Sequence, residues 1–337
     1  MTDWEDRVSI ALLSMQRHSW EQGTAMQAFL EMGQLDIVTA MAFEAAYRSM
    51  PDGRTATIGV TDGVTDPCST GEALEATARR TGDGRLRHSA DALRNWALKT
   101  APRNENGIVY HLTGGKCFWA DSFYMLPPYL AAIGEPEEAM RQFNGYWEAL
   151  YDPESGLIFH MWDDETKTLN RPLHWGTGNG WTLAAMARMI PMLPDREAQA
   201  LLIDRARKLL DAVLKWMEPD GAFHDILDDA ASFREVNMSQ MTAYTIYRGA
   251  VQGWLEERYI AQAETMRCCA RKNTDEFGFV HQVCGAPTFD RPGRSPEAQA
   301  FALMMENARR HWMKKTRNKG ERNDSNKIDA APACGLF

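Results

Sequence analysis

The chain has 337 residues, 44% hydrophobic and 25% charged, which is ordinary for a soluble globular protein large enough to bury its own core. Its net charge of −9 argues against nucleic acid as the main partner, because a phosphate backbone demands a basic face. No stretch is long and apolar enough for a membrane helix, and the first residues, MTDWEDRVSI, lack the pattern of a secretory signal.

The six cysteines are scattered, with no CxxC pair, and the chain contains no HExxH motif. We therefore expect six reduced thiols in a cytoplasmic protein. We also expect no bound metal and no other cofactor. The sequence does not indicate an oligomeric state.

Apolar residues recur at spacings of three and four, which predicts twelve helices separated by breaks rich in Gly, Pro and Asp. In chain order, the helices are expected at about 3–17, 19–33, 34–50, 69–82, 84–100, 119–134, 136–151, 177–193, 196–217, 238–256, 258–272 and 295–313. Strand signals are weak. The best is 107–112, where we expect one edge of a small hairpin.

The expected helices fall into pairs, with a longer loop after every second helix. Six helical hairpins can close into a double ring, so we predict an all-α fold, an (α/α)6 barrel, over residues 1–313. The long loops between pairs are rich in Trp, His and Asp, which indicates a binding cleft at one end of the barrel. Residues 314–337 begin with a basic run and are expected to form a largely disordered tail.

Two aspartates lie at the start of an expected helix or just before one, in chemically rich surroundings. Asp66 lies in a loop where Asp-Pro also favours a turn, and Asp62 is a nearby competitor. Asp121 lies among aromatic side chains at a helix start, in the run Phe118-Trp119-Ala120-Asp121-Ser122-Phe123-Tyr124-Met125. Apolar surroundings raise the pKa of a carboxyl and a helix N-terminus lowers it, and the sequence does not decide between them. Paired carboxylates are typical of glycosidases, whereas helix capping is the competing interpretation.

A second group of candidates surrounds a glycine-rich run. His160 precedes the run, which reads His174-Trp175-Gly176-Thr177-Gly178-Asn179-Gly180-Trp181. Three glycines near a helix start lower its stability, so we expect close backbone approach to a ligand, with indole faces stacking on a sugar ring. A lone histidine is more often structural, but two histidines flank this run. Weaker candidate loops of the same cleft surround Trp20, His224 and the segment 284–290.

These blocks resemble glycoside hydrolase family 105, the unsaturated rhamnogalacturonyl hydrolases, and its relative family 88, the unsaturated glucuronyl hydrolases. The matching residues are Trp119-Ala120-Asp121-Ser122-Phe123-Tyr124-Met125, Trp175-Gly176-Thr177-Gly178-Asn179-Gly180-Trp181, and Asp66 with Gly71 and Leu74. The likeness spans about residues 8–310. The blocks WEQG, from Trp20, and VCGAP, from Val283, are similar to a fungal-type branch.

The resemblance implies an (α/α)6 barrel that hydrates the C4=C5 double bond of a 4,5-unsaturated uronic acid at the non-reducing end of a small oligosaccharide. It implies that Asp121 is the general acid/base and Asp66 its partner carboxylate. It places His160 near the double bond and makes Trp175 and Trp181 ring-stacking walls. The expected substrate-binding set is completed by Trp20, Trp119, Tyr124, His174, Thr177 and His224.

One position departs from the family's pattern. Bacterial rhamnogalacturonyl members place an Arg, thought to pair with the uronate carboxylate, where this chain has Thr177. A hydroxyl does not replace a bidentate guanidinium. Either another cation takes this role, or the substrate is not the usual uronate. The candidate cations are Lys116, Arg171, His174 and His224.

Two other classes of protein stay open. A shared fold does not fix function, so a recruited lyase, epimerase or cyclase acting on an intracellular specialised metabolite could use Asp121 for proton transfer. A non-catalytic helical binding protein is the second alternative, although both carboxylates are present. In the favoured interpretation the partner is a small-molecule substrate, an unsaturated disaccharide or another small glycoside.

Overall fold

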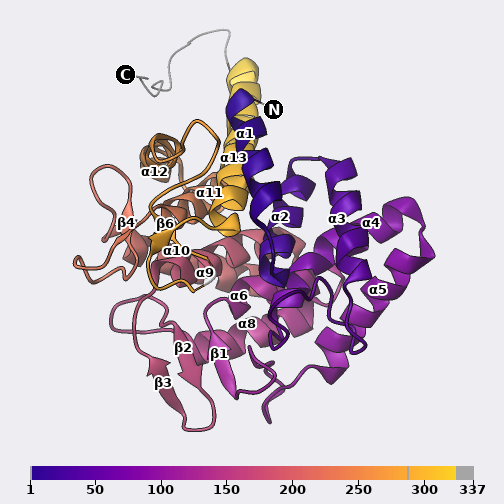
Figure 1. Cartoon of the computed structure of the whole chain (residues 1–337). Helices are drawn as coiled ribbons and strands as arrows, with labels where there is room; N and C mark the ends of the chain where they lie inside the picture. Colours follow the sequence, from indigo (N-terminus) through magenta and orange to yellow (C-terminus); the bar gives the residue numbers. More distant parts are fainter. Residues whose placement is uncertain (1, 287, 324–337) are drawn as a thin grey trace.

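Six helices form a closed inner ring in the described part of the chain. The computed structural model describes residues 2–286 and 288–323 (Figure 1). The ring contains α2 (Ser19–Glu31), α4 (Gly71–Thr81), α7 (Pro127–Ala132), α9 (Gly176–Met189), α11 (Val236–Gln252) and α13 (Pro296–Asn323). Each helix packs against the next in this order, and α13 packs back against α2. The ring therefore has no open edge.

A second layer of helices covers the ring. It consists of α1 (Asp3–Met15), α3 (Leu35–Tyr47), α5 (Gly84–Asn95), α8 (Pro136–Leu150), α10 (Arg196–Leu214) and α12 (Ile260–Lys272). Each outer helix packs on at least one inner neighbour: α3 packs on both α2 and α4, and α1 packs on α13. Every residue of the inner helix α9 is buried, whereas α10 buries one stripe, as an amphipathic outer helix does. The predicted (α/α)6 barrel is confirmed.

Short strands and one-turn helices precede the inner helices and mark one end of the barrel. A three-stranded antiparallel sheet joins β1 (Cys117–Trp119), β2 (Met161–Asp163) and β3 (Thr168–Arg171). Two small hairpins are β4 (Phe223–His224) with β5 (Arg234–Glu235), and β6 (Val283–Cys284) with β7 (Pro292–Gly293). Two short helices also precede inner helices: η1 (Asp66–Thr70) before α4, and α6 (Ser122–Met125) before α7. Elsewhere, η2 (Trp96–Thr100), η3 (Ile190–Met192) and η4 (Glu257–Tyr259) follow α5, α9 and α11. This end of the barrel carries the N-termini of the inner helices.

Two local expectations differ from the structure. The helix expected over 119–134 is divided, because β1 occupies its start and Pro127 and Pro128 begin a new helix, α7, after α6. Proline lacks the N–H that a continuous helix needs at these positions. The segment 107–112 forms no regular strand and makes only isolated bridges, such as Arg103 with Val109. Its backbone is instead tied by Gln142, which accepts from the Val109 N–H.

The last helix is longer than the sequence predicts. Residues 314–323 continue α13 beyond the helix end expected at residue 313. The boundary of the barrel domain stays a prediction. The rest of the expected tail, 324–337, lies outside the described residues. α13 lies beside α1, so the two ends of the barrel domain are neighbours (Figure 1).

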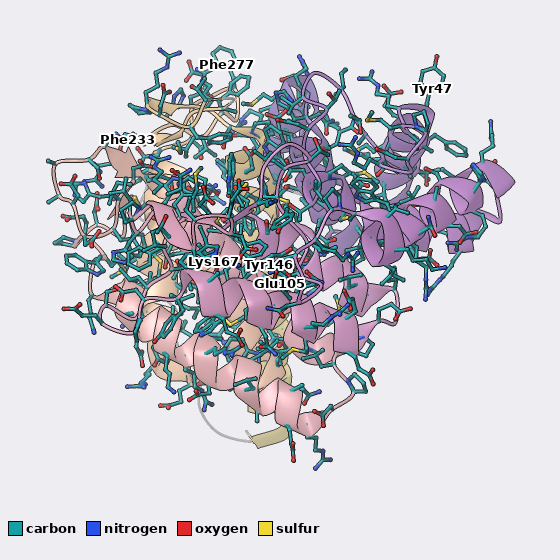
Figure 2. All side chains as sticks on the ribbon, turned by 90° about the horizontal axis from the view of Figure 1, so that it is seen from below. Tyr47, Glu105, Tyr146, Lys167, Phe233 and Phe277 are labelled. Atoms are coloured by element: carbon teal, nitrogen blue, oxygen red, sulfur yellow. The ribbon has the colours of Figure 1, made fainter. Side chains whose placement is uncertain are left out.

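A few large apolar side chains are exposed on the outer surface. Figure 2 shows Tyr47 and Phe277 projecting from the edge of the molecule, whereas Tyr146 lies inside and is fully buried. Single exposed aromatics of this kind are normal on a protein surface. Among the described residues, no helix is long and apolar enough to cross a membrane. The predicted cytoplasmic location stays a prediction.

Four cysteines are free thiols, as the sequence predicts: Cys68, Cys117, Cys269 and Cys284. Cys334 lies outside the described residues. Neighbouring helical residues point about 100° apart, so Cys269 is buried in α12 while Cys268 is half-buried.

Candidate active site

A cavity of about 240 Å³ opens at the N-terminal ends of the inner helices. Its polar lining is made by Asp66, His111, Asp121, His160, Arg171, Thr177, Asn237, Cys284, Thr288, Ser295 and Glu297. Its apolar lining is made by Trp20, Trp119, Met125, Met161, Trp175, Trp181 and Phe289. The lining comes from all parts of the barrel, so the cavity exists only when the ring is closed.

Asp121 lies where β1 ends and α6 begins. It is the N-cap of α6, yet its side chain makes no capping hydrogen bond, and Oδ2 is buried with no partner among the described residues. Burial raises the pKa of this carboxyl to about 6, against smaller lowering effects of its backbone and of Arg171. Desolvation therefore outweighs the helix N-terminus at this position. The capping interpretation for Asp121 does not fit the structure.

Asp66 begins the short helix η1 and lines the same cavity. Burial raises its pKa well above the ordinary value, and the negative charges of Asp121 and Asp62 raise it further. Asp62 is exposed and does not line the cavity. A side chain at Gly63 would place its Cβ 2.9 Å from Asp66 Oδ2, so this glycine leaves room for the carboxylate. Asp66 and Asp121 are thus two interacting carboxyls in one cavity.

Each aspartate has a histidine nearby. His160 Nε2 lies 3.9 Å from Asp121 Oδ2, and His111 Nε2 lies 3.9 Å from Asp66 Oδ1. Burial lowers the pKa of both histidines to about 3, so both rings are neutral near pH 7. Neutral rings do not stabilise the ionised carboxylates, which is consistent with the raised pKa values of the aspartates.

The two histidines are held by tryptophan rings. His160 stacks on Trp175 with centroids 4.5 Å apart, and its Nδ1 has no partner among the described residues. His111 stacks on Trp119 at 4.3 Å, and its Nδ1 is 3.0 Å from the hydroxyl of Thr65. His111 was not a candidate in the sequence, because the segment around it was interpreted only as a strand edge.

The predicted tryptophans all reach the cavity. Trp175 donates its indole N–H to Asp225 Oδ1 at 3.0 Å, and Trp20 donates its indole N–H to Glu297 Oε1. Trp181 is buried and packs on Tyr124, with centroids 4.6 Å apart. Anchored indoles present fixed apolar faces, which suits stacking against a sugar ring.

Arg171, at the end of β3, is half-buried and lines the cavity. The β2–β3 pairing places it opposite Met161, next to His160. The Arg171 guanidinium makes no ion pair and no side-chain hydrogen bond with any residue that the structure describes. Of the four cations considered from the sequence, Arg171 alone lines the cavity within the described residues.

The other candidate cations are engaged elsewhere. Lys116 is exposed and pairs with Glu165 at 3.2 Å. His174 Nδ1 lies 2.7 Å from Asp228 Oδ2, and its ring stacks on Phe159. The ring of His224 contacts the Ser232 carbonyl at 2.8 Å. Neither histidine lines the cavity, so the structure does not place them with the other predicted binding residues.

Tyr124 also lies behind the cavity wall. It is fully buried, and its ring packs against Trp181. The Arg188 guanidinium lies over the Tyr124 ring, 4.7 Å from the ring centroid. Thr177 does line the cavity, and its Oγ1 is buried with no partner among the described residues. The predicted set is therefore divided into cavity-lining and supporting residues.

The glycine-rich run has a packing role. A Cβ at Gly178 would lie 2.8 Å from the Ala120 Cβ, and one at Gly180 would lie 3.0 Å from the Met241 Cβ. A Cβ at Gly176 would lie 3.0 Å from the His224 carbonyl oxygen. None of the three glycines lines the cavity. The structure thus gives close packing of α9, and not the expected backbone approach to a ligand, as the reason for glycine.

Three further cavity residues were not among the candidates from the sequence. They are Asn237, Ser295 and Glu297. All three line the cavity, because α11 and α13 begin at its rim. Among the described residues, no group of three His, Cys, Asp or Glu side chains is arranged to hold a metal ion.

The fold and the cavity together define a class of protein, the six-hairpin glycosidases of the (α/α)6 type with two carboxyls in an aromatic cavity. A model of glycosyl hydrolase family 88 matches residues 1–292, and the chain therefore belongs to this family. The resemblance to families 105 and 88 that the sequence motifs indicate is thereby confirmed. The likeness to a fungal-type branch stays a prediction.

Two curated relatives show the range of similarity. The chain is 30% identical over 185 residues to the unsaturated rhamnogalacturonyl hydrolase YesR of Bacillus subtilis, which covers 51% of this chain and 54% of that protein. It is 27% identical over 143 residues to an unsaturated 3S-rhamnoglycuronyl hydrolase of Alteromonas, which covers 39% of this chain and 35% of that protein. The chain spans about half the length of the curated relatives it matches.

Solved structures share the fold over almost the whole chain. A possible member of family GH105 from Salmonella enterica superposes with a TM-score of 0.81 and 19% identity, covering 94% of this chain and 93% of that chain. An unsaturated glucuronyl hydrolase specific for heparin superposes with a TM-score of 0.69 and 13% identity, covering 93% and 97%. At these identities the likeness supports the fold alone.

Proposed function

We propose that the protein hydrates the C4=C5 double bond of a 4,5-unsaturated uronic acid at the non-reducing end of a small oligosaccharide. The observation that carries the proposal is Asp121, a half-buried residue of the aromatic cavity beside Asp66. Its Oδ2 is buried without a partner among the described residues, and its pKa is raised. A carboxyl that keeps its proton to about pH 6 is suited to general acid catalysis. Family membership and the names of the curated relatives favour the same chemistry.

The proposed reaction uses one proton donor and one water. Asp121 donates its proton to C4 while water adds to C5, and the water's proton passes to the Asp121 carboxylate. The resulting hemiketal at C5 opens by breaking the bond from C5 to the ring oxygen, which stays on C1. C1 then expels the oxygen of the neighbouring sugar. The carboxyl of Asp121 is regenerated, so the step needs no second reagent.

Asp66 and His160 have supporting roles in this proposal. Asp66 holds the attacking water or the substrate hydroxyls, and the nearby charge of Asp121 helps it to keep its own proton. His160, neutral and with a free Nδ1, contacts the sugar near the double bond. Trp175 and Trp181 form walls for the ring, with Trp119 and Trp20 at other sides of the cavity.

Arg171 supplies the cation that the family's pattern places at the position of Thr177. It lines the cavity, is half-buried, and has no carboxylate partner within the described residues. A guanidinium binds a carboxylate through two parallel hydrogen bonds, which suits recognition of a uronate. Thr177 would add a single hydroxyl contact from α9.

The proposal is tested by following the ultraviolet absorbance of the conjugated double bond. Disaccharides made by pectin lyases and by glycosaminoglycan lyases are incubated with the wild type and with Asp121→Asn. Loss of absorbance with the wild type and not with the variant is expected, and the fastest disaccharide gives the substrate class. If no disaccharide is consumed at high enzyme concentration, the proposal fails, and the recruited-enzyme alternative becomes the account to test.

A further inference from the structure

A third carboxyl lines the cavity and has no part in the proposed reaction. Glu297 belongs to the first turn of α13, and the residue is only 2% exposed. One oxygen, Oε1, accepts the indole N–H of Trp20. The other oxygen, Oε2, is buried and has no partner among the described residues. A buried polar atom without a partner is unfavourable, so a ligand that pairs with it gains affinity.

No cation compensates the charge of Glu297. Within the described residues it makes no ion pair, and the charge that acts on it is that of another carboxyl, Glu21 of α2. Glu21 is occupied at its own helix start, where Oε2 accepts the backbone N–H of His18 at 2.9 Å. Burial and the Glu21 charge raise the pKa of Glu297 to about 8, against smaller lowering effects of its own backbone, Ser295 and Trp20. The neutral, protonated acid is therefore the favoured form of Glu297 at pH 7.

The position of that proton follows from the contacts. Oε1 already accepts a hydrogen bond from Trp20, so the hydroxyl of the neutral acid is at Oε2. This hydroxyl belongs to a residue that lines the cavity. Asn237 of α11 also lines the cavity, and its Oδ1 is a buried acceptor without a partner among the described residues. The start of α13 thus offers a donor, and the start of α11 an acceptor, to a ligand.

We propose that Glu297 is a specificity-determining residue that donates a hydrogen bond from Oε2 to a hydroxyl group of the bound sugar. The proposal rests on the proposed function, because it takes the ligand to be a sugar. A sugar hydroxyl can both accept and donate a hydrogen bond. It can therefore accept from the Glu297 hydroxyl or donate to Oδ1 of Asn237. A sugar analogue without this hydroxyl would leave the buried Glu297 donor unpaired. The site would therefore discriminate strongly against that analogue.

The test measures binding and not turnover, in variants built on Asp121→Asn. Affinity for the unsaturated disaccharide that the wild type consumes is followed by quenching of tryptophan fluorescence as a function of pH. Glu297→Gln keeps a donor at this position, whereas Glu297→Leu has a similar size and no donor. Glu297→Leu is expected to weaken binding on the order of 10-fold or more below pH 8, and Glu297→Gln only slightly.

The pH dependence separates a donor from a structural residue. Affinity of the parent is expected to fall as the pH rises through about 8, because Glu297 loses its proton. Glu297→Gln is expected to lose this step while retaining the other titratable groups of the cavity, namely Asp66, His111, His160 and Cys284. Glu21→Gln removes the neighbouring charge, so the step should move to lower pH. Melting temperatures confirm that each variant is folded.

Three results would overturn the inference. Binding by Glu297→Leu that equals the parent's would show that the carboxyl does not contact the ligand. Affinity that rises through pH 8 would show that the ionised form is the acceptor. A pH step that persists in Glu297→Gln would assign the titration to another group. If the wild type consumes no unsaturated disaccharide and the parent binds none, the proposed function itself has failed, and the inference falls with it.

Discussion

Asp121 combines a position that favours ionisation with surroundings that oppose it. A helix N-terminus stabilises a negative charge, but here the side chain makes no capping hydrogen bond, and burial raises the pKa to about 6. The neutral histidines beside it add no positive charge. At the scale of single residues, the site therefore keeps a proton where an ordinary aspartate would lose it.

The proton on Asp121 predicts the pH dependence of catalysis. The raised pKa means that the acid form persists to about pH 6, and it is lost as the pH rises further. kcat/KM for the unsaturated disaccharide should therefore fall about tenfold per pH unit above this value. Initial rates of absorbance loss from about pH 4 to about pH 8 measure this. A level profile up to pH 8 would mean that Asp121 is not the acid.

Arg171 makes a second prediction at this scale. Arg171→Met should lower kcat/KM on the order of 10- to 100-fold, because a charge-assisted pair with the uronate is lost. Arg171→Lys should retain only part of the wild-type kcat/KM, since an ammonium group cannot form the two parallel hydrogen bonds of a planar guanidinium. Lys116→Met is the matched control and should behave like the wild type, because Lys116 is exposed and paired with Glu165.

A neutral methyl ester of the uronate gives an independent readout for Arg171. The wild type should prefer the acid over the ester, and Arg171→Met should lose most of this preference. A variant that keeps the wild-type preference would show that another group binds the carboxylate.

At the scale of helices and strands, the site is a set of helix starts. α2, α6, α9, α11 and α13 each bring a cavity residue within their first turn or at their N-cap. Buried hydrogen bonds hold these helix starts in place, and Glu235 makes several of them. Its carboxylate accepts the N–H groups of Asn237 and Met238, and also that of Cys284 in β6. This residue ties α11 to the β6–β7 hairpin at the cavity rim.

Glu235 predicts how stability changes with pH. Burial raises its pKa to about 7, from an ordinary value of 4.5, so the folded state binds this proton more tightly than the unfolded chain does. Its contribution to stability is fully present below pH 4.5 and is lost as the pH rises through about 7. Glu235→Gln has no titrating group at this position. Over this pH range its free energy of unfolding should therefore fall by about 1–3 kcal/mol less than that of the wild type.

Urea unfolding of both proteins at low and neutral pH measures the difference in slope. Glu235→Gln is expected to be less stable in absolute terms, because its amide cannot accept all three N–H groups. The slope with pH is the decisive quantity. Equal slopes in the two proteins would contradict the buried titration of Glu235.

The sequence predicted the helices well and the site in part. Helix bounds follow from periodicity and caps, which are local, so α3, α8, α10 and α12 lie within a few residues of expectation. Asp66 and Asp121 were found because motifs mark them. Glu297 was not, because its indole partner Trp20 is distant in sequence, and Arg171 was only one of four candidates, because its place depends on the β2–β3 register.

At the scale of the whole molecule, the barrel is closed by its first and last helices. α1 lies against α13, and the buried carboxylate of Glu5 both caps α1 through Thr2 and pairs with Arg310 of α13. The cavity takes residues from both α2 and α13, which pack against each other, so this closure also completes the site.

Closure predicts that Arg310 matters for stability and not for chemistry. Arg310→Met leaves the buried Glu5 carboxylate without its cation and should lower the unfolding free energy by about 1–3 kcal/mol. Urea unfolding measures the change. Lys208→Met is the control, because Lys208 pairs only with an exposed aspartate, and no resolvable change is expected. Stability of Arg310→Met equal to that of the control would contradict the closing role of the pair.

The central claim is that Asp121 protonates C4 during hydration of the double bond. The most direct test is to measure where a solvent-derived proton is incorporated. The unsaturated disaccharide is converted in D2O, and the initial product is observed by NMR. Hydration by Asp121 predicts loss of the C4 alkene signal together with a single deuteron at C4, delivered to one face, and no reaction in Asp121→Asn. Release of the neighbouring sugar with the C4=C5 double bond intact and no deuteron at C4 would contradict the account.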